Sequence, residues 1–266
     1  MLEMLFDTFI YTGNAIVTTW ILVFVVAMTM LGLSRIIAGV RKIQQRRFMW
    51  QTLRHELKWS ALNLACTTIV LSQVSGLLVR AGWLETNPEP ASWYIVLGEF
   101  LLYFFVFDLY FYIAHRTMHI EPLYSWTHRV HHKSIAPNPL SSSSMNPLEG
   151  IAEGLIIPIF LACFTVHETT MVFIIPFATL MGLYVHCGYE FMPGWWYRNP
   201  MTSWFITPMF HDQHHQYVKF NYGGFTTIWD RILGTTRPQF FDDFDHLKNR
   251  ESQFQDGTSN AYNASQ

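Results

Sequence analysis

Residues 93–119 read WYIVLGEFLLYFFVFDLYFYIAHRTMH, an apolar run over 93–113 that continues into a pair of histidines. A helix needs roughly 20 mostly apolar residues to cross the hydrocarbon core of a bilayer, so 93–113 is expected to span a membrane. His115 and His119 stand four positions apart, which puts both imidazoles on one face of the same helix. The stretch therefore predicts a membrane-spanning helix that ends in two metal-ligand side chains.

The rest of the chain is apolar in the same way. Residues 15–34 and 60–79 are also long enough to span, and a further apolar region covers about 150–187. That region breaks near 165–168, which predicts a tight helical hairpin whose first arm enters the bilayer without crossing it cleanly. Half of the chain is hydrophobic and 14% is charged, against about 25% charged in a soluble domain. We expect an all-α integral membrane protein with about four transmembrane helices and a cytosolic helical cap.

Lys and Arg are distributed unevenly among the loops, and this predicts the orientation of the spans. Seven of the seventeen lie within residues 35–58, so this loop is expected in the cytosol. The next loop, 81–92, contains neither residue and is expected on the other side. The third span then crosses back to the cytosol just before His115, and the hairpin leaves and re-enters on the same side. Every histidine motif is therefore expected at the cytosolic face. The expected location is a bacterial inner membrane, or the endoplasmic reticulum if the protein is eukaryotic.

Two stretches are predicted to lie in the headgroup region of the bilayer. In the basic loop, Met49, Leu53 and Leu57 recur every four residues beneath an Arg/Lys face, as in a helix lying flat on a membrane. Residues 193–210 hold three tryptophans and a tyrosine, which is typical of an aromatic belt at the membrane surface. The tail after about residue 250 is polar, a composition typical of disorder.

Nine of the twelve histidines fall in a pattern. HxxxH occupies 115–119, HxxHH occupies both 128–132 and 211–215, and His186 stands at the return of the hairpin. Imidazole suits iron, zinc, copper and nickel. Nine ligands are too many for one ion but suit two ions with four or five nitrogens each, leaving positions open for oxygen. The three remaining histidines, expected to pack or face solvent, are His55, His167 and His246.

Other functional classes fit less well. The net charge of −2 and the lack of a basic patch argue against nucleic-acid binding. There is no HExxH zinc motif and no GxSxG nucleophile motif. No flavin, haem or NAD motif is present, so a redox enzyme of this sequence would need a separate electron donor. Two alternatives stay open: a membrane metal carrier, and a zinc hydrolase on the same scaffold.

The order of the motifs resembles the fatty acid hydroxylase / sterol desaturase superfamily of membrane di-iron enzymes, with flanks most similar to the C-5 sterol desaturase branch. The flanking residues that carry the resemblance are DLYFY at 108–112, HHKSIAPNP at 131–139, NPLEG at 146–150, NYG at 221–223 and WDRILGT at 229–235. The resemblance divides the chain into N-terminal transmembrane helices with a basic cytosolic loop (1–92), a di-iron catalytic domain (93–238) and a polar tail (239–266).

The resemblance implies two Fe ions, O2 as co-substrate and oxidation of an unactivated C–H bond in a lipid (sterol-like, fatty acyl or sphingolipid). It also implies an electron-donor protein of the cytochrome b5, ferredoxin or rubredoxin type. The sequence departs from the family at two positions. Asn146 stands where the sterol branch usually has histidine, and Gly182 stands where some relatives have a further ligand. The implied metal ligands are His115, His119, His128, His131, His132, His186, His211, His214 and His215.

Three further residues are candidates for catalytic roles. Asp108 shares a helix face with His115 and is expected to orient a ligating imidazole, the alternative being a polar cap on the span. Asp230 is expected to do the same or to cap a turn, and Asn146 is expected to hold a metal-bound water. Because Asn146 replaces the histidine of the desaturase branch, we favour hydroxylation, with sterol-type desaturation as the alternative.

Overall fold

The computed structural model describes residues 21–30, 32–33, 36, 42–44 and 50–247. Over this part of the chain the regular structure is helical except for two strands of two residues each. Three helices are long and apolar enough to cross a membrane: α2, α3 and α7. The elements are α2 (Trp50–Arg80), β1 (Thr86–Asn87), α3 (Trp93–Met118), α4 (Leu123–Trp126), η1 (His131–Lys133), η2 (Pro139–Ser143), α5 (Pro147–Gly154), α6 (Ile156–Cys163), β2 (Val166–His167), α7 (Glu168–Val185), α8 (Pro208–Tyr217) and α9 (Ile228–Ile232).

Helix α2 begins ten residues before the span expected at 60–79, because its first turns are continuous with that span. The prediction of a separate helix lying flat in the headgroups was therefore wrong for the described part of the basic loop. Leu53 and Leu57, which we placed on the lipid side of such a helix, are partly buried against other helices. The cluster that they contact contains Ala27, Leu140 and Leu183.

Several expectations fall wholly or partly outside the described residues. Of the span expected at 15–34, the described residues include an apolar helix over Ile21–Met30, and residues 15–20 are not described. Met49 and residues 248–266 of the expected tail are not described. Residues 240–247, which we assigned to the polar tail, are helical. They bury Phe240, Phe244 and Leu247 in a cluster with residues of α8.

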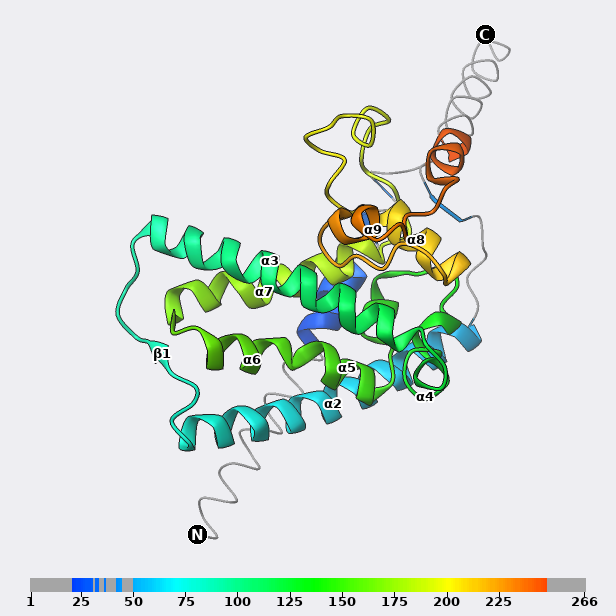
Figure 1. Cartoon of the computed structure of the whole chain (residues 1–266). Helices are drawn as coiled ribbons and strands as arrows, with labels where there is room; N and C mark the ends of the chain where they lie inside the picture. The colour runs from blue at the N-terminus through cyan, green and yellow to red at the C-terminus, as the bar shows by residue number, and fades with distance from the viewer. Residues whose placement is uncertain (1–20, 31, 34–35, 37–41, 45–49, 248–266) are drawn as a thin grey trace, which may run out of the picture.

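The hairpin is broken where the sequence predicts a break. The first arm consists of two short helices, α5 and α6, and neither is long enough to cross a membrane. After α6 the chain forms β2, which pairs in parallel with β1, joining Thr86 to Val166 and Asn87 to His167. α7 then returns along α3. Together α5 and α6 run the length of the helical layer, from Glu149, which contacts His128 near the end of α3, to β2, which lies beside β1 at the opposite end (Figure 1).

α3 and α7 lie side by side, and α5 and α6 lie between this pair and α2 (Figure 1). The last third of the chain lies against one end and one flank of α3 and α7. Aromatic side chains make the contact: the ring of Phe225 lies 4.3 Å from that of Phe107 on α3 and 5.1 Å from that of Phe177 on α7, between centroids. Pairs of this kind stabilise by about 0.5–1.5 kcal/mol beyond the area they bury. The loop before α9 is therefore held against the groove between α3 and α7.

Candidate metal centre

The nine patterned histidines come together at one end of the long helices, in two groups. Within each group the candidate ligand atoms lie within 4.8 Å of one another. One group has five members and the other has four, which matches the expected four or five nitrogens per ion. All nine except His119 are buried, and His119 is half-buried. The group of five holds His115, His119, His128, His132 and His214, and the group of four holds His131, His186, His211 and His215.

Each HxxHH motif is divided between the two groups. In the motif at 128–132, the first and last histidines join the group of five, and His131 joins the group of four. The motif at 211–215 is divided the other way, with His214 alone in the group of five. The two histidines of the HxxxH motif, in contrast, join the same group. In α8, which holds the motif at 211–215, residues four apart share a helix face and the residue between them points elsewhere. The motif at 128–132 lies in a turn and the short η1, and its first and last histidines converge as well. Each HxxHH motif therefore bridges both groups.

The hydrogen bonds made by Nδ1 show which ring nitrogen carries the proton and which has a free lone pair. Nδ1 of His115 lies 2.9 Å from the backbone oxygen of Tyr222, and Nδ1 of His128 lies 2.6 Å from Oε1 of Glu149. Both oxygens accept, so each Nδ1 carries the proton and each neutral ring has a bare lone pair on Nε2. These two Nε2 atoms are 3.0 Å apart. Two lone pairs at that distance repel each other unless a cation lies between them, and this fits a bound metal ion.

The same arrangement recurs in both groups. Nδ1 of His214 donates to the backbone oxygen of Phe220 at 2.6 Å, and Nδ1 of His186 donates to that of Gly182 at 2.7 Å. Nε2 of His186 then lies 3.1–3.2 Å from the Nε2 atoms of the three other members of its group. A ligating imidazole almost always donates its other N–H to a carboxylate, a backbone carbonyl or water. The donor set therefore fits two metal ions bound through Nε2.

Burial keeps these imidazoles neutral. Desolvation lowers the pKa of His132 to about 3 and that of His186 to about 4. Desolvation also places the pKa of His128 and that of His214 well below the usual value. Neutral imidazole is the form that binds a metal. No proton has to be displaced from Nε2 at neutral pH for these rings to act as ligands.

Asp108 is buried beside the site but binds backbone rather than an imidazole. Its carboxylate accepts hydrogen bonds from the N–H groups of Phe225 and Thr226 at 2.9 and 2.8 Å, and from Oγ1 of Thr226 at 2.5 Å. The expectation that it orients a ligating imidazole directly was wrong. Asp108 instead anchors the loop before α9 to the middle of α3.

Asp230 acts on a ligand through one intervening residue. Its carboxylate accepts the N–H groups of Tyr222 and Gly223 at 2.8 and 2.7 Å, and Oγ1 of Thr235 at 2.7 Å. The backbone oxygen of Tyr222 is the acceptor for His115. Both expected roles are therefore combined: Asp230 caps the turn, and the turn orients the imidazole. Burial raises the pKa of Asp230 to about 6.

Asn146, which we selected from the sequence, caps a helix, whereas Glu149, which we did not select, contacts one of the candidate metal ligands. Oδ1 of Asn146 caps α5 by accepting the N–H of Leu148 at 2.9 Å, and its amide nitrogen donates to the oxygen of Trp126 at 3.2 Å. Its amide is thus engaged in a helix cap, so we do not retain it as the holder of a metal-bound water. Glu149, which sequence reasoning did not select, is fully buried and contacts His128. A carboxylate in an apolar stretch is itself a signal of function.

The three unpatterned histidines lie outside both groups. His246 is exposed, and Nε2 of His55 lies 3.5 Å from the oxygen of Val130. His167 is part of a polar network at the opposite end of the long helices, with Glu99 and Asn87. That placement agrees with a packing or surface role for all three.

Comparison with known proteins identifies the family of this arrangement. The model of the family "Fatty acid hydroxylase" matches residues 100–235, which contain all nine histidines. A Delta(7)-sterol 5(6)-desaturase of Leptosphaeria maculans is 31% identical over 193 residues, covering 70% of this chain and 51% of the relative. A protein of the same name from Gibberella zeae is 30% identical over 223 residues, covering 82% of this chain and 61% of the relative.

A further relative, the Delta(7)-sterol 5(6)-desaturase of Candida albicans, is 26% identical over 231 residues, covering 84% of this chain and 56% of the relative. The chain spans about half the length of the curated relatives it matches. No solved structure matches. Because the family model matches half of the chain and includes the complete donor set, the protein belongs to the fatty acid hydroxylase family.

Proposed function

We propose that the protein is a membrane oxidoreductase that holds two iron ions in its histidine groups and uses O2 to oxidise a sterol-like lipid. The observation that carries the proposal is the convergence of neutral Nε2 lone pairs at 3.0–3.2 Å within both groups. Bound there, an iron pair would supply the redox chemistry that activates O2 toward an unactivated C–H bond.

The residues of the chain hold and orient the ligands. The backbone oxygens of Tyr222, Phe220 and Gly182 and the carboxylate of Glu149 fix the tautomer of four imidazoles. Asp230 holds Tyr222, and Phe111 covers His115 with ring centroids 5.0 Å apart. Such outer partners raise ligand basicity, and apolar covers limit the access of water.

Desaturation is the outcome that the relatives favour. From the sequence we favoured hydroxylation because Asn146 replaces a histidine, but that residue caps a helix. The relatives, in contrast, bear the name sterol desaturase. In desaturation the lipid loses two hydrogens, while O2 takes up two electrons and two protons from outside and leaves as two waters. The electrons come from a separate donor of the cytochrome b5, ferredoxin or rubredoxin type.

The proposed orientation in the membrane follows from the positive charges of the loops. We propose four spans, counting residues 15–34, and a helical cap that faces the cytosol because seven Lys and Arg lie in 35–58. The domain bounds 1–92, 93–238 and 239–266 remain part of the proposal. Labelling a cysteine introduced at Met201, which is 80% exposed, from outside whole cells would refute this orientation, whereas labelling only after permeabilisation supports it.

The reaction is tested with the purified protein, iron, a reducing system, a sterol with a Δ7 double bond and isotopically labelled O2. A product lighter by two hydrogens and free of label supports desaturation. A labelled alcohol would restore hydroxylation. Replacing His131 by alanine provides the inactive control. Metal analysis separates the alternatives: two irons support the oxidase, and one zinc supports a hydrolase. Metal without turnover on any lipid supports a carrier.

A further inference from the structure

Glu56 is a buried carboxylate on α2, outside the residues 100–235 that the family model matches. It is 1% exposed. Oε1 accepts hydrogen bonds from the hydroxyl of Ser134 and from the amide of Asn138, both at 2.9 Å, and Oε2 accepts one from the same amide at 2.9 Å. Burying a carboxylate is costly unless it is hydrogen-bonded. The burial of Glu56 therefore depends on residues 134–138, the segment that follows η1.

The first residue of this segment ends the short helix that carries His131. Ser134 is the C-cap of η1, and its backbone N–H donates to the oxygen of His131 at 3.1 Å. A 3-10 helix of three residues has few internal hydrogen bonds of poor geometry, so contacts at its end decide its orientation. The hydroxyl of Ser134 makes such a contact with Glu56. Glu56 thus acts on His131 through one intervening residue.

The middle of the segment lies against the chain that follows His186. Gly188 has a φ of +77°, and a Cβ added there would lie 2.8 Å from the backbone oxygen of Pro137. That distance is too short for two atoms that are not bonded, so glycine is what allows this close approach. A shift of residues 134–138 would therefore displace the backbone next to His186.

A third contact links the segment to α8. The side-chain amide of Gln44 donates to the backbone oxygen of Ile135 at 2.8 Å and to Oδ1 of Asp212 at 2.7 Å. Asp212 directly follows His211 in α8. The segment 134–138 is thus connected to three members of the group of four.

The group of four depends on the backbone that carries it more than the group of five does. Nδ1 of His186 has an acceptor, whereas the three other Nδ1 atoms are buried and have no hydrogen-bond partner in the described part of the chain. These three atoms belong to His131, His211 and His215. In the group of five, Nδ1 of three members donates to backbone oxygens or to Glu149. The packing of the carrying segments is therefore what orients most imidazoles of the group of four.

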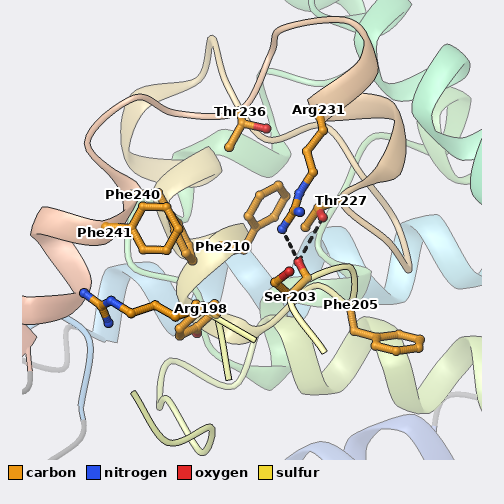
Figure 2. Close-up of a pocket in the computed structure, with 10 residues that line it drawn as sticks. Arg198, Ser203, Phe205, Phe210, Thr227, Arg231, Thr236, Phe240 and Phe241 are labelled. Carbon is orange, nitrogen blue, oxygen red and sulfur yellow. Dashed lines mark hydrogen bonds between the residues drawn. The ribbon is translucent and has the colours of Figure 1, made fainter. Parts of the chain in front are cut away.

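The packing around α8 is incomplete beside His211. Phe210, the residue before it, lines a cavity of about 460 Å³ together with Phe240 (Figure 2). Side chains that line a cavity lose contacts on that side. Apolar packing there does not by itself fix the position of His211, which gives more weight to the polar contact between Asp212 and Gln44.

We propose that Glu56 is a positioning residue for the metal ion of the group of four. By holding residues 134–138, it fixes the backbone beside three imidazoles, so that their Nε2 atoms converge on one point. It touches neither metal nor substrate and acts through Ser134 and Asn138. This role rests on the proposed function, because it requires that both histidine groups bind iron.

The test uses the full chain in detergent, loaded anaerobically with Fe(II), and measures the apparent Kd of each iron by competition with a chelator. E56A should raise the Kd of one of the two irons about 10-fold or more, the usual cost of losing an outer partner of a ligand, and should leave the other unchanged. E56Q should give a smaller rise, because its amide oxygen still accepts from Ser134. S134A should loosen the same iron, because it breaks the connection between Glu56 and η1.

S60A is the matched control. Ser60 lies one turn further along the same face of α2 and is 3% exposed. Its hydroxyl donates to the oxygen of Leu140 at 3.3 Å and accepts that of Ser143 at 3.0 Å, so both hydrogen bonds are with η2. S60A should lower the apparent melting temperature, as E56A should, but should leave the Kd of both irons unchanged.

Mössbauer spectra of the isotopically enriched protein identify which iron is loosened. The doublet that is lost from E56A should be the one missing in H211A, not the one missing in H119A. Loss of the H119A doublet, equal loosening in E56A and S60A, or unchanged Kd values in S134A and in every Glu56 variant that folds would each overturn the role of Glu56. In these three cases two irons in wild type would leave the proposed function intact, whereas wild type without iron would overturn both.

Discussion

Two histidine–carboxylate pairs lie at opposite ends of the long helices and have nearly the same geometry. Nδ1 of His128 lies 2.6 Å from Oε1 of Glu149, and Nδ1 of His167 lies 2.7 Å from Oε1 of Glu99. In both pairs the carboxylate fixes the tautomer, because the proton on Nδ1 leaves Nε2 as an acceptor. The pairs differ in what Nε2 faces.

At the histidine end, Nε2 of His128 lies 3.0 Å from the Nε2 atoms of His115 and His132. At the other end, Nε2 of His167 accepts a hydrogen bond from the amide of Asn87 at 3.0 Å. The first lone pair has no donor, whereas the second has one. The comparison teaches that a histidine–carboxylate pair does not by itself show whether the histidine binds a metal or only stabilises the fold. The partner of Nε2, the ring nitrogen that faces away from the carboxylate, distinguishes the two cases.

Removing the metal should give the largest loss of stability, and the loss should arise at the histidine end of the long helices. Chelation of the purified protein should lower its apparent melting temperature, because the ions bind the folded state and leave facing lone pairs when removed. Ligand at 100 times its Kd stabilises by about 2.7 kcal/mol per site. Differential scanning fluorimetry with and without a chelator measures the shift, and added iron should reverse it. An unchanged melting temperature would contradict a metal at the histidine end.

Replacing the histidine of each pair by alanine compares the two ends directly. H128A should lose metal and activity, because a ligand is removed from the group of five. H167A should keep its metal, since His167 belongs to neither group. Metal content by mass spectrometry is the readout, and H131A and H214A should behave like H128A. Equal metal loss in H128A and H167A would break the distinction between the ends.

Neutralising the carboxylates should give a smaller difference. E149Q should lower metal affinity or activity about 10- to 100-fold, the usual cost of losing an outer partner of a ligand. E99Q should leave metal affinity unchanged and is the matched control. Competition with a chromophoric chelator measures the affinity of both variants. If E149Q bound metal like wild type, Glu149 would have only a packing role.

The smallest effects should come from the hydrogen-bonded network of Glu99, His167 and Asn87, which stabilises the fold at the other end. Glu99 also accepts the N–H of His167 at 3.1 Å and Oγ1 of Thr170 at 2.5 Å. H167A should therefore destabilise the protein by about 1–3 kcal/mol, because it removes the hydrogen bonds of the ring to the Glu99 carboxylate and to Asn87. N87A should cost about 0.5–1.5 kcal/mol, because it removes one hydrogen bond. Thermal unfolding of the iron-loaded variants measures both, and a larger loss for N87A would contradict this ranking.

Much of the fold follows from local patterns in the sequence. The apolar run at 93–113 and the break near 165–168 are recognisable because length and apolar composition are local properties of the chain. The start of α2 was missed because its first turns are polar. Glu56 is nevertheless 1% exposed, since Ser134 and Asn138 each donate to its carboxylate at 2.9 Å. These partners are about eighty residues away in sequence, and no local pattern predicts them.

The sequence by itself determined which side chains can bind metal. Spacings of three and four residues place imidazoles close together on a helix, so the eight histidines of the three motifs could be named without a structure. His186 was named from its place at the return of the hairpin. Only the tertiary structure decided how they divide. His131 and His132 are neighbours in sequence but belong to different groups, as do His214 and His215. Successive side chains point about 100° apart on an α-helix such as α8 and about 120° apart on a 3-10 helix such as η1. The group that each one joins therefore depends on where α3, α7 and α8 pack around it.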